Sequence, residues 1–548
     1  MRGADVIAAI LKKEGVENIG VIPYNGLEEA AAVAGIRPII FRQERVGVNL
    51  ADGLSRITNG KSIGVFSMQA GPGAENAFAG VAQAYADSVP ILLLPASASR
   101  NRSAIHPTFS PWQTYKTVTK WSEQINMPER IPEMLRRAFN LLRNGRPGPV
   151  LLDVPSDILS SEMTDLSVNY VPSKSWKASG NLSDIRQSLS LLLKAKSPVI
   201  HAGQGILYGE ATDELKEFAE LTQIPVMTTL AGKSAFPENH PLSLGTRANT
   251  ATGPVVHYLN TSDVVFGIGC SFTKTHVGAE LLESKTLIHS TNHVGDIDKE
   301  YICSQAIVGD AKLVLRQLIE EVNSSGNWLA LKNSGNPVED IKYLKEQWMK
   351  EWIPKLTSNE IPINPYRVIW ELSNFVDPYN TIVNHESGSP RDQMSPFFQA
   401  IAPRSYIGWG KSTQLGYSLG LAMGSKMANP SKLSINVMGD YAFGMVGMDL
   451  ETTVRENIPI LTIILNNSYM AIYGPNDFPV ADEKYKIKHL TGNYSAIAEA
   501  MGSYVEKIES PDEIRSSLAR AANVVQKGKP ALLEFITRAE QAFSHKGS

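Results

Sequence analysis

The chain has 548 residues, of which 43% are hydrophobic and 20% are charged, and its formal net charge at pH 7 is −3. That length exceeds what one hydrophobic core supports, so several domains are expected. The near-neutral charge gives no electrostatic basis for binding nucleic acid or an anionic membrane, and no apolar run reaches the roughly 18 residues of a membrane span. Two cysteines are too few for a disulfide framework or a zinc site, so we expect a cytoplasmic protein.

The first third alternates β-rich runs with helical patterns, which predicts a parallel sheet covered on both faces. Its predicted strands are 38–41, 62–67, 91–94 and 149–154. Glu44 follows the first of these strands and opens a predicted helix. A Glu in the first turn of a helix is also explained by the helix dipole alone, so the residue by itself does not indicate chemistry.

The middle third begins after a polar connection near residues 156–183 and repeats the α/β pattern. Its predicted strands are 198–202, 224–229, 263–268 and 286–289, with a helix over 210–221. Gly203-Gln204-Gly205 follows the first strand, but the dinucleotide pattern Gly-x-Gly-x-x-Gly is incomplete because position 208 is Tyr.

The last third follows a second linker near residues 323–337 and has predicted strands at 381–383, 433–438, 460–465 and 531–536. A helical pattern over 446–456 connects two of these strands, so they should be parallel and Asp440 and Asn467 should emerge at the same edge of the sheet. Carboxylate, amide and carbonyl oxygens suit Mg²⁺, and phosphate oxygens would complete its coordination. A helix beginning near Phe443 would point free N–H groups toward that anion. A plain Gly-Asp turn is the alternative.

The first and last thirds share a short echo. Residues 88–94 and 457–463 both join a helix to a buried strand through an X-Pro turn.

Gly439-Asp440, then a helix, then a strand that ends in Asn466-Asn467 resembles the thiamine diphosphate signature, Gly-Asp-Gly followed by Asn-Asn. The chain thereby resembles the acetolactate synthase-like superfamily of thiamine diphosphate enzymes, although Tyr441 stands where Gly is usual. The resemblance implies an α/β fold with three consecutive doubly wound parallel-sheet domains. They would be a pyrimidine-binding domain over 1–175, a central domain over 183–325 and a diphosphate-binding domain over 338–548.

The resemblance also assigns roles. Glu44 would be the catalytic acid that hydrogen-bonds the pyrimidine ring of the cofactor, and Gly71-Pro72-Gly73 matches the loop that follows it in the family. Asp440, Asn467 and the main-chain oxygen of Tyr469 would hold Mg²⁺. The residues expected to bind the cofactor are Gly388, Ser389, Thr413, Leu415, Gly439, Asp440, Tyr441, Ala442 and Asn467, with Leu415 as the wedge between its two rings. The substrate-pocket candidates are Tyr24, Asn25 and His106.

Relatives that bind FAD or ADP use an Arg soon after the third central strand and an acid after the fourth. Residues 270–275 and 290–292 have neither, so we expect no tightly bound flavin.

The resemblance favours a lyase or carboligase that decarboxylates a 2-oxo acid, a small-molecule substrate, and can transfer the acyl unit to an acceptor. A 2-hydroxyacyl-CoA lyase or C–C bond hydrolase is the second hypothesis. The third is a non-catalytic cofactor-binding paralogue, motivated by Tyr441. In the family Glu44 faces the partner's diphosphate-binding domain, so we expect a homodimer or a dimer of dimers.

Overall fold

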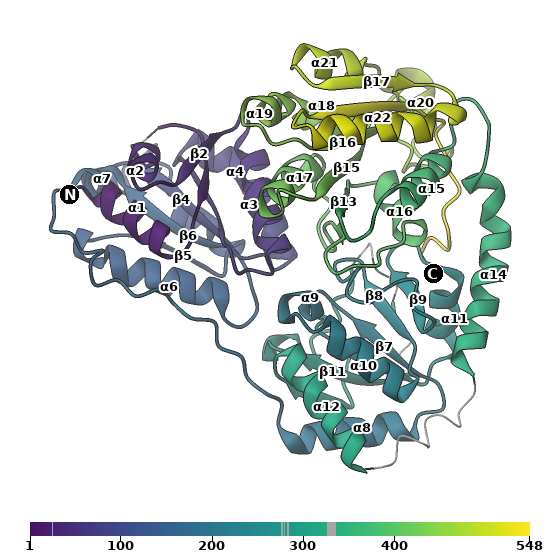
Figure 1. Ribbon diagram of the computed structural model, residues 1–548. Helices are drawn as coiled ribbons and strands as arrows, with labels where there is room; N and C mark the ends of the chain where they lie inside the picture. Colours follow the sequence, from purple (N-terminus) through teal and green to yellow (C-terminus); the bar gives the residue numbers. More distant parts are fainter. Residues whose placement is uncertain (25, 276–277, 279, 282–283, 326–335, 548) are drawn as a thin grey trace.

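The computed structural model describes residues 1–24, 26–275, 278, 280–281, 284–325 and 336–547. They form three six-stranded sheets with helices on their faces, which we call the first, central and third domains (Figure 1). Strands that pair within these sheets run parallel. The predicted α/β class with three parallel sheets is therefore confirmed, and each sheet lies within one of the three predicted ranges. In the described part of the chain, no helix is long and apolar enough to cross a membrane.

The first domain has the strand order β2-β1-β3-β4-β6-β5. Its strands are β1 (Asn18–Val21), β2 (Arg37–Ile40), β3 (Gly64–Gln69), β4 (Ile91–Ser97), β5 (Trp121–Gln124) and β6 (Val150–Pro155). Its main helices are α1 (Gly3–Lys13), α2 (Leu27–Val33), α3 (Glu44–Ile57), α4 (Pro72–Ala86) and α6 (Ile131–Arg143).

The central domain has a different order, β12-β11-β10-β7-β8-β9. Its strands are β7 (Pro198–Ala202), β8 (Val226–Thr229), β9 (Ser243–Arg247), β10 (Val264–Ile268), β11 (Thr286–Thr291) and β12 (Gln305–Val308). Its helices include α8 (Leu182–Lys194), α9 (Gly205–Gly209), α10 (Thr212–Thr222), α11 (Gly253–Thr261) and α12 (Ala311–Ser325).

The third domain repeats the topology of the first, because its order β14-β13-β15-β16-β18-β17 is the same path through six strands. The strands are β13 (Thr381–His385), β14 (Tyr406–Ile407), β15 (Leu433–Gly439), β16 (Leu461–Asn466), β17 (Tyr504–Ile508) and β18 (Ala531–Ile536). The helices include α14 (Pro337–Leu356), α15 (Pro365–Phe375), α16 (Ser389–Phe397), α17 (Tyr417–Ala428), α18 (Asp440–Val446), α19 (Leu450–Arg455), α21 (Tyr494–Ala500) and α22 (Ile514–Gln526).

Two predicted helices differ from the structure. The pattern over 446–456 is not one helix, because a 3-10 turn, η5 (Gly447–Asp449), separates α18 from α19, and α18 begins at Asp440 rather than near Phe443. The carboxylate of Asp449 accepts the backbone N–H of Arg42 in the first domain at 2.8 Å, so this turn serves a domain contact. The helix predicted from residue 210 begins at Thr212, since Glu210 has a left-handed backbone.

One hydrophobic core is continuous across the first and third domains. It includes Val46 and Leu50 of α3 together with Leu419 and Met423 of α17. Figure 1 shows these two helices side by side where the two domains meet. The strand ends that carry the predicted site residues therefore belong to two domains with a common core.

Candidate active site

Glu44 begins helix α3 and is 7% exposed. One of its carboxylate oxygens lies 3.3 Å from the point where a Cβ on Gly73 would sit, so the absence of a side chain there lets the start of α4 approach the acid. Tyr115 lies close by, and its hydroxyl donates to the carbonyl oxygen of Ala74. Burial, followed by the charge of Glu44, raises the pKa of Tyr115. Glu44 thus sits in an enclosed niche that two segments of the first domain build.

Helices α3 and α17 approach closely enough for their backbones to touch. A Cβ on Gly420 would lie 2.3 Å from the carbonyl oxygen of Val46, and a Cβ on Gly424 would lie 2.1 Å from that of Leu50. Only glycine permits such an approach. Because both numbers increase together, the helices run in the same direction, and Glu44 and Gly416 lie at the same end of the pair.

Asp440 and Asn467 follow neighbouring parallel strands, as predicted. In the register of β15 and β16, Gly439 pairs with Leu465. The two oxygens of the Asp440 carboxylate accept the backbone N–H groups of Tyr441 and Ser468, both at 2.8 Å. The amide oxygen of Asn467 accepts the N–H of Tyr469 at 2.9 Å. The two strand tips therefore form one oxygen-rich corner.

The corner formed by Asp440 and Asn467 contains a buried carboxylate and is open on the side of Gly439. Asp440 is 4% exposed, and burial raises its pKa to about 6. Apart from Gly439 and its two neighbours in the chain, no described residue has an atom within 4 Å of the point where a Cβ on Gly439 would sit. Ala442 is buried behind it. Among the described residues no cationic side chain pairs with Asp440, and a buried carboxylate without such a partner suits a bound cation.

Tyr441 does not distort the turn. It lies in the first turn of α18, where an ordinary side chain is allowed, and it is 39% exposed. The usual Gly of the family is therefore not needed for this backbone shape.

A second wall of the corner comes from residues 386–389 and 413–415. Gly388 has a left-handed φ of 77° and caps α16, which begins at Ser389. The hydroxyl of Ser387 donates to the carbonyl oxygen of Thr413 at 3.3 Å. Leu415 is partly buried against the core shared by the first and third domains. The candidate diphosphate loop and the candidate ring-binding segment are thus in direct contact.

Glu386 was not among the predicted residues, although it ends the same strand-to-loop run. Both of its carboxylate oxygens are used: one accepts the N–H of Ser387 at 2.7 Å, and the other accepts the hydroxyl of Ser418 at 2.7 Å. Burial raises the pKa of Glu386. Its position at a strand end was the available signal in the sequence.

Two buried polar side chains in this wall have no hydrogen-bond partner within the described residues. They are Ser389, through its hydroxyl, and Gln414, through both its amide oxygen and its nitrogen. Buried polar groups are normally paired, so such groups indicate where a polar ligand belongs. The donor set and these two residues fit the diphosphate and pyrimidine ends of thiamine diphosphate.

The substrate-pocket candidates are less clearly placed. Tyr24 is 58% exposed, and its backbone N–H donates to Glu28 at 2.7 Å. His106 lies in an exposed loop that lines a small surface hollow with Phe109. Asn25 lies outside the described residues. A role for these three residues in substrate binding stays a prediction.

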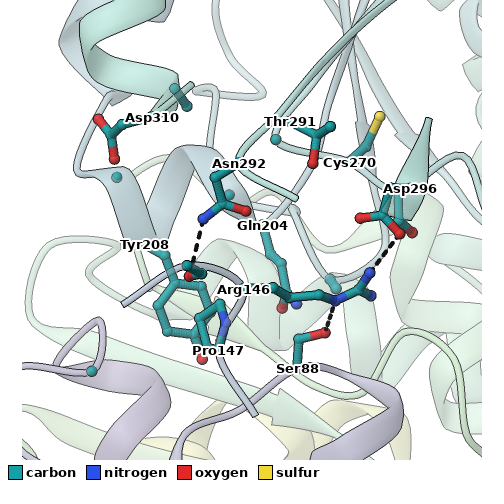
Figure 2. Close-up of a pocket in the computed structure, with 18 of the residues that line it drawn as sticks. Ser88, Arg146, Pro147, Gln204, Tyr208, Cys270, Thr291, Asn292, Asp296 and Asp310 are labelled. Carbon is teal, nitrogen blue, oxygen red and sulfur yellow. Dashed lines mark hydrogen bonds and ion pairs between the residues drawn. The ribbon is translucent and has the colours of Figure 1, made fainter. Parts of the chain in front are cut away.

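A separate cavity of about 810 Å³ lies where the central domain meets the other two. Figure 2 shows Arg146 of the first domain between Ser88 and Asp296, which it contacts at 2.8 and 2.5 Å. Gln204 and Tyr208 of the central domain also line it. The expectation of no bound flavin was based on a missing Arg and a missing acid, but Arg146 and Asp296 reach the cavity from other segments. That basis is incomplete, and the expectation stays a prediction.

Comparisons with known proteins agree with this geometry. Family models described as the N-terminal TPP binding domain, the central domain and the C-terminal TPP binding domain of thiamine pyrophosphate enzymes match residues 1–117, 185–318 and 386–535. The chain is 31% identical over 557 residues to a probable acetolactate synthase large subunit of Methanocaldococcus jannaschii, covering 98% of this chain and 92% of the relative. It is 30% identical over 572 residues to the protein of that name in Methanococcus aeolicus, covering 99% and 93%. It is also 28% identical over 567 residues to a glyoxylate carboligase of Escherichia coli O157:H7, covering 98% and 93%.

All three domains are thus matched in chain order, and the relatives are covered almost end to end. The repeated topology of the first and third domains fits two domains that bind the two ends of one cofactor. The chain belongs to the thiamine pyrophosphate enzymes of the acetolactate synthase superfamily.

Proposed function

We propose that this enzyme is a thiamine diphosphate- and Mg²⁺-dependent carboligase that decarboxylates a 2-oxo acid and can transfer the acyl unit to a second carbonyl compound. The observation that carries the proposal is the oxygen-rich corner formed by Asp440 and Asn467 at adjacent strand tips. The names of the relatives, acetolactate synthase and glyoxylate carboligase, support carboligation as the reaction class.

In this proposal Asp440, Asn467 and the main-chain oxygen of Tyr469 hold Mg²⁺, which neutralises the diphosphate. The N–H groups at the start of α16, together with the unpaired hydroxyl of Ser389, bind phosphate oxygens. Oxygen ligands around a small hard cation and N–H groups around the anion are the chemistry this site requires. Gly439, Tyr441 and Ala442 complete the same wall.

The pyrimidine end would lie between Leu415 and the carbonyl oxygen of Thr413 of one copy of the chain and Glu44 of the other. When bound, thiamine diphosphate supplies a carbon nucleophile that adds to a carbonyl group and stabilises the charge released by decarboxylation. Glu44, which is 7% exposed, would share a proton with the pyrimidine ring. Leu415 would fix the angle between the two rings of the cofactor.

We also propose self-association into a homodimer or a dimer of dimers with the active site at the interface. Tyr441, Met445 and Met448 support it, because they expose apolar surface beside the candidate metal ligands and are 39%, 40% and 49% exposed. Exposed apolar surface next to a site is typical of a region that a partner covers. Equilibrium sedimentation and the dependence of specific activity on enzyme concentration test this proposal. A monomer with full specific activity would refute it.

Calorimetry is the first test of cofactor binding. We expect saturable uptake of thiamine diphosphate in the presence of Mg²⁺ and loss of that uptake in excess EDTA. If the folded protein took up no thiamine diphosphate, the proposed function would be refuted. Uptake of thiamine diphosphate that persists in excess EDTA would refute only the proposed metal site.

Substrate class is tested by measuring carbon dioxide release from a panel of 2-oxo acids, with and without aldehyde or 2-oxo acid acceptors. We expect release from at least one acid, and a condensed product when an acceptor is present. Cleavage of 2-hydroxyacyl-CoA esters or cyclic diketones without such release would favour the second hypothesis. Cofactor uptake without exchange of its C2 proton into D₂O would favour a non-catalytic paralogue.

A further inference from the structure

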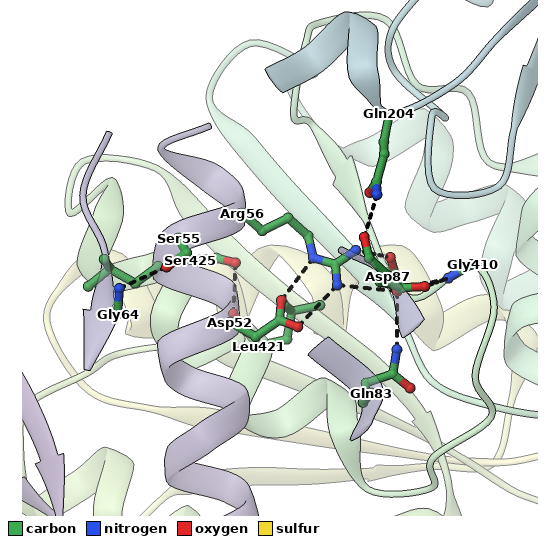
Figure 3. A network of polar contacts seen from close by, with 12 residues as sticks. Asp52, Ser55, Arg56, Gly64, Gln83, Asp87, Gln204, Gly410, Leu421 and Ser425 are labelled. Atoms are coloured by element: carbon green, nitrogen blue, oxygen red, sulfur yellow. Dashed lines mark hydrogen bonds and ion pairs between the residues drawn. The ribbon is translucent and has the colours of Figure 1, made fainter. Parts of the chain in front are cut away.

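A buried carboxylate of the first domain, Asp87, accepts hydrogen bonds from the backbone of the third domain (Figure 3). Asp87 ends helix α4 and is 0% exposed. Its Oδ1 accepts the N–H of Gly410 at 3.1 Å and the N–H of Lys411 at 3.0 Å, and its Oδ2 accepts the N–H of Gly410 at 3.0 Å. Gln83, one turn earlier on α4, donates to Oδ2 at 3.1 Å.

Arg56 is the cation that this carboxylate shares with the buried carboxylate of Asp52. Its guanidinium bonds Asp52 at 2.9 and 3.1 Å and Asp87 at 3.2 Å, and it donates to the carbonyl oxygen of Gly408 at 2.8 Å. Arg56 is 1% exposed. Charges buried this deeply are tolerated only when they are paired, and their geometry is fixed by the pairing. The carboxylate of Asp87 is therefore held from the side of the first domain by two donors.

The central domain also reaches Asp87. The amide nitrogen of Gln204, just before α9, donates to the main-chain oxygen of Asp87. Lys411, whose N–H the Asp87 carboxylate accepts, donates from its side chain to the hydroxyl of Ser271 at 2.9 Å. Asp87 thus lies at a point where all three domains meet.

What Asp87 holds is the start of the segment that carries Thr413 and Leu415. Among the described residues, none accepts a hydrogen bond from the N–H groups of Ser412, Thr413 or Gln414. The next attachments along the chain are the carbonyl oxygen of Thr413, which accepts the hydroxyl of Ser387 at 3.3 Å, and the N–H of Ser418, which donates to Glu386 at 3.1 Å. Residues 412–414 belong to no helix, strand or turn, so their path depends on where Gly410 and Lys411 are fixed before them and where the segment is held after them.

We propose that Asp87 is a positioning residue for the cofactor: by fixing Gly410 and Lys411 it sets the path of residues 412–415, and with it the carbonyl of Thr413 and the side chain of Leu415. This inference rests on the proposed function, because those two groups are assigned to the pyrimidine end of the cofactor. Asp87 itself touches neither cofactor nor substrate in this proposal.

Asp87→Asn is the direct test. The Asn side chain keeps one acceptor oxygen but turns an NH₂ group toward N–H donors, so at least one grip on Gly410 or Lys411 is lost. We expect amide hydrogen exchange in the cofactor-free protein to become about tenfold faster or more at residues 410–415, with α17 unchanged. We expect the Kd for thiamine diphosphate with Mg²⁺ to rise about tenfold or more, while the substrate KM at saturating cofactor stays the same.

Glu456→Gln is the matched control. Glu456 ends α19 and precedes β16, which occupies the same place in the third sheet as β4 does in the first, so it is the counterpart of Asp87. Its carboxylate bonds the side chains of Arg37 and Arg455 rather than a backbone segment of the site. This control should leave exchange at 410–415 and cofactor affinity unchanged. Equal effects of the two substitutions would overturn the proposal.

The other possible outcomes of these experiments also test the positioning role of Asp87. Unchanged exchange, or faster exchange with unchanged cofactor affinity, in Asp87→Asn would overturn the positioning role. If that variant does not fold, exchange in the cofactor-free wild-type protein replaces it: the amides of Gly410 and Lys411 should exchange more slowly than those of residues 412–414, and equal rates would overturn the proposal. Failure of wild-type protein to take up cofactor would instead refute the proposed function, whatever the exchange shows.

Discussion

The first and third domains have the same strand order, yet different residues follow equivalent strands. After the second strand in chain order, the first domain has Glu44 at the start of α3, and the third domain has the 410–416 segment before α17. After the third strand, the first domain has Gly71-Pro72-Gly73 and the third has Asp440 and its turn. The same topology thus carries an acid in the first domain and the oxygen-rich corner of Asp440 and Asn467 in the third. This illustrates that function resides in the loops rather than in the fold.

The shared topology extends to individual turns. Ser88 and Asn457 stand at the start of the echo found in the sequence, and both have left-handed backbones, with φ of 59° and 53°. Each precedes the fourth strand of its sheet. The helices α3 and α17, which are counterparts in the two sheets, pack on each other in parallel within one chain. The candidate residues of the two domains therefore lie at one end of this helix pair.

The largest expected effect comes from the acid of the first domain. Glu44→Gln keeps the shape of the niche but removes the group that would share a proton with the pyrimidine ring. We expect about 1000-fold slower turnover and C2 proton exchange, with cofactor affinity nearly unchanged. Single-turnover kinetics and exchange of the C2 proton followed by NMR measure both. Activity close to that of wild type would remove Glu44 from its proposed role.

The contact between the two counterpart helices is tested by Gly424→Val. A Cβ at Gly424 would lie 2.1 Å from the carbonyl oxygen of Leu50, so the helices must separate. We expect the cofactor-free protein to lose about 3 kcal/mol of stability, measured by urea unfolding followed by circular dichroism. Gly444→Val is the matched control, since among the described residues no atom outside its own helix turn lies within 4 Å of a Cβ there. Equal stability of the two variants would show that the helices are not in backbone contact.

In the third domain the expected effect falls on cofactor retention rather than on turnover chemistry. Asp440→Ala removes a charged ligand from the proposed Mg²⁺ site, and we expect the Kd for thiamine diphosphate with Mg²⁺ to rise about 100-fold. Tyr469→Phe is the control, because only the main-chain oxygen of Tyr469 is proposed as a ligand. Calorimetry at several Mg²⁺ concentrations separates the two. A similar loss in both variants would argue against a backbone ligand at this position.

The strand pattern explains how far the sequence alone could be interpreted. Central strands such as β7 and β16 are buried along their whole length, so they appear as apolar runs and were predicted within a few residues. The strands that were not assigned are mainly the edge strands β5, β9, β12, β14 and β17. The run Trp121-Ser122-Glu123-Gln124 of β5 is only partly buried and has no continuous apolar pattern. Edge strands need their neighbours to be recognised.

The site divides in the same way. Asp440 and Asn467 were predicted because each directly follows a recognisable strand, and Glu44 because the segment around it resembles the family. Asp87 was not predicted, because its carboxylate interacts with Gly410 and Lys411, which lie 323 and 324 positions further along the chain. A contact made by folding between domains has no local pattern in a single sequence.

We expect the smallest effect from a substitution of Glu456, whose ion pair is much less buried than that of its counterpart Asp87. The Glu456 carboxylate bonds Arg37 at 2.8 Å and also bonds Arg455, and these two arginine side chains are 51% and 37% exposed, whereas Asp87 and Arg56 are almost completely buried. Exposed ion pairs contribute little, because water screens them and both side chains lose freedom. Glu456→Gln should therefore change stability by less than about 1 kcal/mol in urea unfolding. A loss as large as that of Gly424→Val would mean that the two domains depend on this exposed pair, and the contrast between the buried and the exposed counterpart would no longer hold.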